Sequence, residues 1–456
     1  MDFASLIQRT ADALFMPWTI LVLLGTGAYL TVRFGFVQVV RLPEAFRTMA
    51  ATQSSGSGGA LTPFQAFMTA LAASIGMGNI AGVATAIVSG GPGALFWIWA
   101  YGFFATAIKF CEASLGLRFR IAAGERVASG PMYYLRDGIG SPALAWIYAL
   151  VAGVAALTTT PFTQPNSMAL VINSQFGLPK IWAGLAIAVL TWLVIIGGVK
   201  SIGRAAEKLS PLKVGLYLVG GVVVIVAHAG QLPAVLALVF REAFSTRAAV
   251  GSAAGLGVMT AIRYGLARGV YANEAGYGTA AVAYGTAKSA RPDQQGLNAV
   301  MEVFIISFVT SSISALTILV SGVAQQSFDV IRAGGDGLKS TALVAQAFNS
   351  AIPTVGGWVV AFCAFLFGYT TLIGWAYYGE QFFEYLTSGR LSDEGRARFT
   401  TAYRWIYCLL IPLGAIAKVD VVWAWGDLMN GLQIFPNVIG LLGLSGLAAS
   451  FARRRA

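Results

Sequence analysis

Long apolar segments recur along the whole chain, and they constrain the fold more than any other feature. Of the 456 residues, 57% are hydrophobic and only 11% are charged, whereas soluble domains carry roughly 25% charged residues. About 20 consecutive apolar residues cross the hydrocarbon core of a bilayer as one helix. We therefore expect one all-α polytopic membrane domain, residues 1–456, with about eleven transmembrane helices. The predicted spans are 17–37, 63–89, 92–118, 142–160, 179–197, 211–229, 253–285, 297–322, 357–386, 400–417 and 429–452.

The basic residues predict how this domain is oriented. Of the 30 Lys and Arg residues, 20 lie in or beside the loops on one face, counting Lys213 with the loop at 198–210, and 7 lie on the opposite face. Short loops rich in Lys and Arg remain in the cytoplasm. We therefore expect a bacterial inner-membrane protein, surrounded by lipid, with its N-terminus outside and its C-terminus in the cytoplasm. The net charge of +11 then reflects topology, and no nucleic-acid partner is expected.

The reactive residue types argue against catalysis and against a transition metal. The chain has three cysteines, all within predicted spans, and a single histidine. An embedded enzyme needs a cluster of catalytic groups, and a channel needs a filter or a charged ring; neither pattern stands out. We expect no enzyme activity, no cofactor and no metal other than Na⁺. Lys109 and Glu112, three residues apart, are interpreted as a structural ion pair.

Two predicted spans are interrupted by glycine and polar residues, and the interruptions resemble each other. NIAGVATA at 79–86 and NEAGYGTA at 273–280 agree at five of eight positions. Chance agreement in an Ala- and Gly-rich chain is the alternative. Each segment opens a run of five spans, and an odd number forces the two runs into opposite orientations. This predicts a 5+5 inverted repeat, with helices 2–6 in residues 62–250 and helices 7–11 in residues 251–452. The extra N-terminal helix and a cytoplasmic loop fill residues 1–61.

Breaks in membrane helices are predicted to form the binding site. Unpaired backbone groups are costly in lipid, so irregular backbone survives only where it is buried or lines a cavity. Such a break offers N–H groups to a carboxylate and C=O groups to an ammonium or a cation. Paired breaks at corresponding places in two halves are the best sequence indicator of a midplane site. Glycines that only permit close helix packing are the alternative.

At these residues the chain resembles the alanine or glycine:cation symporter family of the amino acid–polyamine–cation superfamily. The resemblance rests on GGPGALFWIW at 90–99, GMGNIAGVATAI at 76–87, QPNS at 164–167, ARGVYANEAGYGTA at 267–280 and TTLIGWAYYGEQ at 370–381. It implies the LeuT-type fold, coupling to Na⁺ or sometimes H⁺, and a small zwitterionic amino acid such as alanine or glycine as the transported partner. A transporter of similar fold for another small solute is the alternative. Met77 stands where many members carry a small polar residue, which leaves the exact substrate open.

The breaks and the resemblance together predict the site residues. The predicted substrate-binding residues are Gly76, Met77, Gly78, Asn79, Gln164, Asn166, Asn273, Gly276, Tyr277, Thr371 and Trp375. Gln164 and Asn166 lie beyond the fourth predicted span and reach the site only if that helix continues past Pro161. Asn79 and Asn273 have an alternative role as hydrogen-bonding residues between helices.

The cation and the coupling group are predicted in the same way. The predicted cation ligands are Ser74, Ile75, Asn79, Thr370 and Thr371. The two threonine hydroxyls have an alternative role in bonding to the preceding helical turn. Glu274 is an ionisable residue at membrane depth and is therefore a coupling or gating candidate. Arg268 and Arg263, on the same span, are its candidate partners, and a purely structural ion pair is the alternative.

Overall fold

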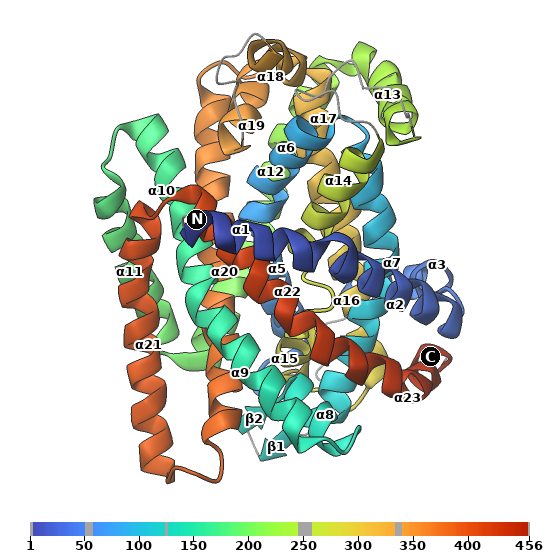
Figure 1. The fold of residues 1–456 in the computed structure, drawn as a ribbon, viewed down its shortest axis with the longest axis vertical. Coiled ribbons are helices and arrows are strands. Elements are labelled where there is room, and N and C mark those ends of the chain that lie inside the picture. Colours follow the sequence, from blue (N-terminus) through green and yellow to red (C-terminus); the bar gives the residue numbers. More distant parts are fainter. Residues whose placement is uncertain (1–2, 51–57, 124–125, 245–257, 333–339, 455–456) are drawn as a thin grey trace.

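The computed structural model describes residues 3–50, 58–123, 126–244, 258–332 and 340–454 (Figure 1). The first third of the chain contains α1 (Phe3–Ala13), the π-helical η1 (Leu14–Thr19), α2 (Ile20–Arg33), α3 (Val37–Val40), α4 (Leu42–Ala50), α5 (Pro63–Ser74), the 3₁₀ turn η2 (Met77–Asn79), α6 (Ala81–Gly90), α7 (Ala94–Arg118), β1 (Ile121–Ala123), β2 (Arg126–Ala128) and α8 (Pro131–Asp137). The only β-sheet in the described ranges is the antiparallel pair of β1 and β2, and an isolated parallel bridge joins Leu61 to Ala287.

The rest of the described chain is helical. Its elements are α9 (Pro142–Thr158), α10 (Thr160–Phe176), α11 (Lys180–Ile195), α12 (Gly198–Ala227), η3 (Ala229–Gln231), α13 (Leu232–Phe244), α14 (Val258–Asn273), α15 (Thr279–Gly285), α16 (Pro292–Val303), η4 (Phe304–Thr310), α17 (Ser311–Val320), α18 (Val323–Arg332), α19 (Ser340–Asn349), α20 (Val355–Thr387), α21 (Asp393–Ile416), α22 (Val419–Gly443) and α23 (Ser445–Ala452).

The membrane-spanning helices follow the predicted pattern. Within the described residues, seven helices are long and apolar enough to cross a membrane, and two bent pairs, α5 with η2–α6 and α22 with α23, qualify as further spans. The shorter apolar helix α11 and the interrupted pair α14–α15 correspond to the two remaining predicted spans. The expected all-α multi-pass membrane fold with helices broken near residues 76–79 and 274–278 is confirmed.

Several spans extend further than predicted, and two of these extensions affect the site. The fourth forms one continuous span from Pro142 to Phe176, because Pro161 falls in the first turn of α10, where a missing N–H breaks no helical bond. The sixth begins at Gly198, not at 211, with Pro211 inside the helix. Lys213 is therefore a fully buried residue of α12, and counting it with a loop was wrong.

The two broken helices lie together at the centre of the molecule. In Figure 1 the chain rises from α5 to α6 and descends from α14 to α15, so the two run in opposite directions. α5 packs against α15, α6 packs against α14, and α20 also packs on α5. α20 is well enclosed, since 83% of its most apolar segment is buried, compared with 33% for α21. Side chains from α20 can therefore reach both breaks.

Loops predicted on opposite faces lie at opposite ends. Figure 1 shows α13 and α18, predicted outside, at one end, and α8 with the β1–β2 hairpin, predicted in the cytoplasm, at the other. At the second end the guanidinium of Arg120 donates to the carbonyls of Gly58, Gly285, Ala287 and Ser289. Arg120 therefore connects, through hydrogen bonds, three loops that were all predicted on the same face.

Candidate functional site

The first break follows Ser74, the last residue of α5. Gly76 is extended (φ −111°, ψ −159°), and the helix bends by 62° before it continues through α6. A Cβ on Gly76 would lie 2.6 Å from Thr371 Oγ1, and one on Gly78 would lie 2.7 Å from Tyr271 Cδ1. The Met77 N–H donates to Gln164 Oε1 at 3.1 Å. The two glycines thus let side chains of α10, α14 and α20 approach the unwound backbone.

The second break depends on left-handed backbone and on a buried carboxylate. Glu274, Gly276 and Gly278 have φ values of +53°, +94° and +84°, and glycine adopts such angles at little cost. The freed N–H groups of Gly276 and Gly278 donate to Glu112 Oε1 at 2.9 and 3.0 Å. Asn437 donates to the same oxygen at 2.8 Å and to the Gly276 carbonyl at 2.8 Å. Glu112 therefore stabilises the unwound turn.

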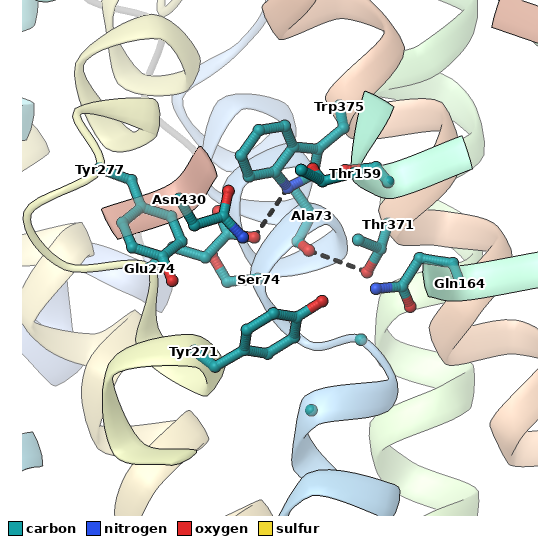
Figure 2. A pocket seen from close by; sticks show the side chains of 13 residues that line it. Ala73, Ser74, Thr159, Gln164, Tyr271, Glu274, Tyr277, Thr371, Trp375 and Asn430 are labelled. Atoms are coloured by element: carbon teal, nitrogen blue, oxygen red, sulfur yellow. Dashed lines mark hydrogen bonds between the residues drawn. The ribbon is translucent and has the colours of Figure 1, made fainter. Parts of the chain in front are cut away.

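A small cavity lies between the two breaks, as Figure 2 shows. Its free volume is about 20 Å³, and about 10–15 Å³ on this measure holds one water molecule. It is lined by Ala73, Ser74, Gly76, Gly78, Thr159, Thr160, Gln164, Tyr271, Glu274, Tyr277, Thr371, Trp375 and Asn430. The lining combines backbone groups, amides, hydroxyls, aromatic rings and one carboxylate.

The Glu274 carboxylate lies at this cavity without the predicted arginine. Its Oε1 accepts from Trp375 Nε1 at 2.7 Å, and its Oε2 accepts from the Thr279 hydroxyl at 3.0 Å. Arg268 lies 5.3 Å from the centre of the Trp423 ring, and it lines a second cavity together with Trp423 and Asp427. The predicted pairing of Glu274 with Arg268 is therefore wrong. Glu274 instead fixes Trp375 against the cavity.

The structure brings eight predicted site residues to the cavity and leaves others outside its lining. Ser74, Gly76, Gly78, Gln164, Glu274, Tyr277, Thr371 and Trp375 line it. Asn166 donates to the carbonyls of Gly414 and Ala417, so it ties α10 to the end of α21. A Cβ on Gly276 would meet Leu23 and Ile434, so this glycine faces α2 and α22. Met77 is buried beside the cavity and reaches it only through the hydrogen bond to Gln164.

The two predicted asparagines, Asn79 and Asn273, form hydrogen bonds with the backbone of their own helices and with side chains of neighbouring helices. Asn79 Nδ2 donates to the Ser74 carbonyl at 3.2 Å, and the Thr310 hydroxyl lies 3.5 Å from Asn79 Oδ1. Asn273 Nδ2 donates to the Gly269 carbonyl at 2.8 Å, and its Oδ1 accepts from the Ser307 hydroxyl at 2.9 Å. Each asparagine therefore connects its broken helix to the α16–η4–α17 span, in keeping with the alternative role considered for them.

An ammonium group lies among the predicted cation ligands. Lys213 Nζ donates to the Ile75 carbonyl at 2.6 Å and to Thr370 Oγ1 at 2.5 Å. The Thr371 hydroxyl donates to the Ala73 carbonyl at 2.8 Å, and the Thr370 hydroxyl donates to the Ala72 carbonyl at 3.0 Å. Of the predicted cation ligands, Ile75 and Thr370 thus place oxygens around a lysine of α12, whereas the Ser74 hydroxyl donates to Glu302.

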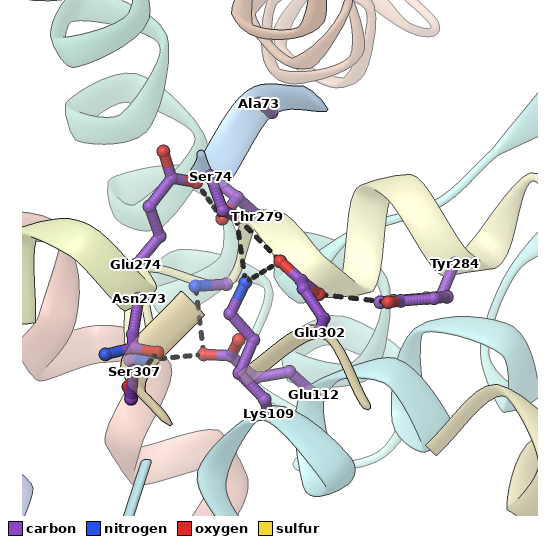
Figure 3. Close-up of polar contacts among 12 residues, drawn as sticks. Ala73, Ser74, Lys109, Glu112, Asn273, Glu274, Thr279, Tyr284, Glu302 and Ser307 are labelled. Carbon is purple, nitrogen blue, oxygen red and sulfur yellow. Dashed lines mark hydrogen bonds and ion pairs between the residues drawn. The ribbon is translucent and has the colours of Figure 1, made fainter. Parts of the chain in front are cut away.

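A second buried ionic cluster supports the break from the other side, as Figure 3 shows. Lys109 pairs with Glu302 at 2.7 Å, and both side chains are almost fully buried. Glu302 also accepts from the hydroxyls of Ser74 at 2.7 Å and Tyr284 at 3.0 Å. The expected pairing of Lys109 with Glu112 is wrong, because Glu112 caps the second break. The cluster connects α5, α7, α15 and α16.

Several residues at the site were not predicted from the sequence. Thr159, Thr160, Tyr271 and Asn430 line the cavity; Tyr271 is close to Asn273 in the chain, but Asn430 lies more than 150 residues away. Glu112 and Lys213 offered a detectable signal, because an ionisable residue within a span marks a functional position. Their partners come from distant helices, which the sequence pattern does not reveal.

Comparison with known proteins decides the family. The model of the sodium:alanine symporter family matches residues 1–454. The chain belongs to the sodium:alanine symporter family. It is 38% identical to the sodium/alanine symporter AgcS of Methanococcus maripaludis, over 99% of this chain and 96% of that protein. It is 33% identical to the probable sodium/glutamine symporter GlnT of Bacillus subtilis, over 95% of this chain and 87% of that protein.

A solved structure supports the same fold. A Na⁺-coupled sialic acid symporter in a substrate-bound outward-open state superposes with a TM-score of 0.55 at 12% identity, covering 95% of each chain. The family model and the 38% identical symporter show that this member of the sodium:alanine symporter family is a multi-pass membrane transporter and not an enzyme. Its class is that of Na⁺-coupled amino acid symporters, as the resemblance implied.

Proposed function

We propose that this protein imports alanine or glycine by alternating access, with the cavity between the two broken helices as the substrate site. The observation that carries the proposal is that both breaks, from opposite halves of the chain, line one buried polar cavity. The proposed repeats at 62–250 and 251–452 would move relative to each other around this cavity. Paired breaks around one midplane site are typical of secondary transporters.

The chemistry of the cavity suits a zwitterion. In our proposal a substrate carboxylate replaces the present acceptors of the Gly76 and Met77 N–H groups, which are the Ser74 carbonyl and Gln164 Oε1. The carbonyl end of α5 at Ala73 and Ser74 supplies acceptors for an ammonium. Gln164 and Thr371 add side-chain hydrogen-bonding groups on the facing helices. In our proposal these groups orient the two charged ends of the amino acid.

The small free volume favours the smallest side chains. Trp375 lies over the cavity and is fixed by its bond to Glu274. The Gly76 and Gly78 backbones lie close to Thr371 and Tyr271, so widening the site requires these neighbours to move. The cavity holds about one water molecule, so these neighbours must move for any amino acid. A methyl group or hydrogen requires less movement than the amide side chain of glutamine, the substrate named for one relative.

Access to the cavity is proposed to pass a pair of aromatic rings. Tyr271 lines the substrate cavity, and its ring centre lies 5.1 Å from that of Trp423, which lines the second cavity with Gly82 and Arg268. This second cavity lies beside α6 and α14, toward the end predicted outside. Separation of the two rings would join the cavities, and release of the Arg120 contacts would open the other end.

The coupling ion is proposed to be Na⁺, bound near Asn79. The Asn79 amide oxygen lies 3.5 Å from the Thr310 hydroxyl oxygen, so two neighbouring oxygens are available there, whereas the Ser74 carbonyl accepts from the amide nitrogen of Asn79. Oxygen ligands of this kind suit a hard cation. The bacterial inner membrane, with the C-terminus in the cytoplasm, is the proposed location.

The test is uptake by purified protein in sealed proteoliposomes. We expect labelled alanine or glycine to accumulate above the outside concentration when Na⁺ is higher outside, to saturate with substrate, and to stop when the gradient is collapsed. Glutamine in excess should compete weakly. Absence of accumulation for both small amino acids would reject the proposal. Conductance that does not saturate would instead indicate a channel.

A further inference from the structure

Lys213 lies inside the fold with its ammonium group enclosed by oxygen atoms. The side chain is fully buried on α12. Nζ donates to the Ile75 carbonyl at 2.6 Å, to Thr370 Oγ1 at 2.5 Å and to the Ala72 carbonyl at 3.2 Å. A lysine ammonium has three donors, so these three oxygens satisfy it completely.

The surroundings of Nζ suit a monovalent cation and carry no formal negative charge. The polar contacts of Lys213 in the described part of the chain are all with carbonyl and hydroxyl oxygens. The carbonyls belong to the C-terminal end of α5, where the helix dipole is negative. The centre of the Phe367 ring lies 5.2 Å from Nζ and adds a favourable cation–π contact.

We propose that the Lys213 ammonium occupies the position predicted for Na⁺ at Ile75, Thr370 and Thr371. Because the side chain already places a positive charge at this position, no Na⁺ binds there. The inference extends the proposed function, because it assumes that the neighbouring cavity binds alanine. Two cations about 3 Å apart repel strongly in a dry interior. The covalent link means that this cation is not transported, and any Na⁺ that moves with the substrate binds elsewhere, as we propose near Asn79.

The geometry also explains how this charge affects substrate binding. Lys213 contacts the last turn of α5 and the first residue of the break, while Ala73 and Ser74 of the same turn line the cavity. Thr370, its third partner, is adjacent to the cavity residue Thr371 on α20. Lys213 is therefore a positioning residue, since its charge holds α5 and α20 in the arrangement that forms the cavity.

Two substitutions distinguish the effect of the charge of Lys213 from the effect of its side-chain volume. Lys213→Ala removes the charge and leaves a space bordered by the oxygens of Ala72, Ile75 and Thr370. Lys213→Met removes the charge but keeps most of the volume. Alanine affinity and thermal stability would be measured on purified wild type and on both variants. The measurements would be made in Na⁺ and in matched choline solutions.

We expect Lys213→Ala to bind alanine at least roughly tenfold more weakly in choline, and Na⁺ to restore most of this loss and to raise its melting temperature. Lys213→Met should lose affinity without rescue by Na⁺, because the methionine fills the space. Adding Thr370→Val to Lys213→Ala should reduce the Na⁺ stabilisation, because it removes one of the three oxygens that border the space. An identical Na⁺ response in wild type and Lys213→Ala would overturn the proposal.

A variant that retains Lys213 provides an independent test if Lys213→Ala does not fold. The proposal expects Thr371→Val alone to leave the Na⁺ dependence of thermal stability unchanged, because Lys213 keeps Na⁺ away. Loss of that dependence in Thr371→Val would overturn it. Failure of every variant and of wild type to bind alanine in any salt would reject the proposed substrate, whereas the stability comparison would still test Lys213.

Discussion

Glu112 shows how a single buried carboxylate can hold a broken helix open. Its Oε1 accepts from two backbone N–H groups of the second break and from Asn437. In a continuous helix those N–H groups would bond to carbonyls of the preceding turn, and in lipid they would lack a partner. The carboxylate thus replaces the missing helical acceptors, and it comes from α7, which packs against both α14 and α15.

We predict that Glu112→Ala destabilises the protein far more than Glu112→Gln. Alanine leaves two buried N–H groups without an acceptor, at about 1–3 kcal/mol each, whereas the glutamine amide oxygen can still accept. Thermal unfolding of the purified variants in detergent provides the measurement. Equal melting temperatures for the two variants would show that the carboxylate does not support the break.

A comparison of the predicted site residues with their positions in the structure shows which of them the sequence could identify. Gly76, Gly78, Gln164 and Trp375 were predicted, because the breaks and the family motifs mark them. Asn166 was misplaced, because its segment was identified but the side of the helix it occupies depends on packing against α21. The partners of Lys109, Glu112 and Lys213 were not predictable, since hydrogen bonds across the bundle depend on the three-dimensional arrangement of helices.

At the scale of elements, α5, α15 and the loops beside them form the end predicted in the cytoplasm. The backbone of Leu61, just before α5, pairs with the segment after α15 through Thr286 and Lys288. Arg120, from the loop after α7, donates to carbonyls of both neighbouring segments. This contact must break if the two broken helices separate at that end.

We therefore predict that Arg120→Ala favours the state open at this end. A cysteine at Ser289, a buried position, in a background without Cys111, Cys363 and Cys408, should react faster with a thiol reagent in the Arg120→Ala variant. Arg120→Lys keeps the charge, but its three donors lie on one nitrogen atom and cannot span four carbonyls as the planar guanidinium does, so it should give an intermediate rate. Equal rates in all three proteins would argue against a role in closure.

The apolar elements themselves were predictable, but their ends were less so. Span lengths follow from hydrophobicity, which the lipid imposes directly. Helix ends depend on local detail: Pro161 permits α10 to continue, and the polar stretch from Gly198 to Ser210 forms the first turns of α12 although it resembles a loop.

At the scale of the whole molecule, topology follows from charge. Removing Lys213 from the count leaves 19 basic residues beside the loops of the predicted cytoplasmic face, so the excess over the other face persists. Arg263 pairs with Asp12 at 2.7 Å, so its charge also has a structural partner. The positive-inside rule therefore still predicts a cytoplasmic C-terminus.

We predict that cysteines introduced at the exposed positions Gln326 and Ser388 differ in labelling, in the same background without native cysteines. An impermeant thiol reagent added to intact cells should label position 326 and not 388, because the first lies on the face predicted outside. The reverse pattern would invert the proposed orientation. Permeabilised cells, in which both positions should react, provide the control.

The central claim is that the unwound segment at Gly76 and Gly78 forms the substrate site. A Cβ at Gly76 would clash with Thr371 Oγ1, and one at Gly78 with the Tyr271 ring. Gly215 on α12 has no atom within 4 Å of an added Cβ, so Gly215→Ala is the matched control. The free energy that favours continuous helix rises by about 1 kcal/mol with each Gly→Ala change, which adds to the steric effect.

The most direct measurement is equilibrium binding of alanine to purified Gly76→Ala, Gly78→Ala and Gly215→Ala proteins, each first shown to be folded by its thermal transition. We predict that the first two bind at least roughly tenfold more weakly than wild type, a loss of about 1.4 kcal/mol, and that Gly215→Ala binds normally. Wild-type affinity in both Gly76→Ala and Gly78→Ala would contradict the unwound-helix site.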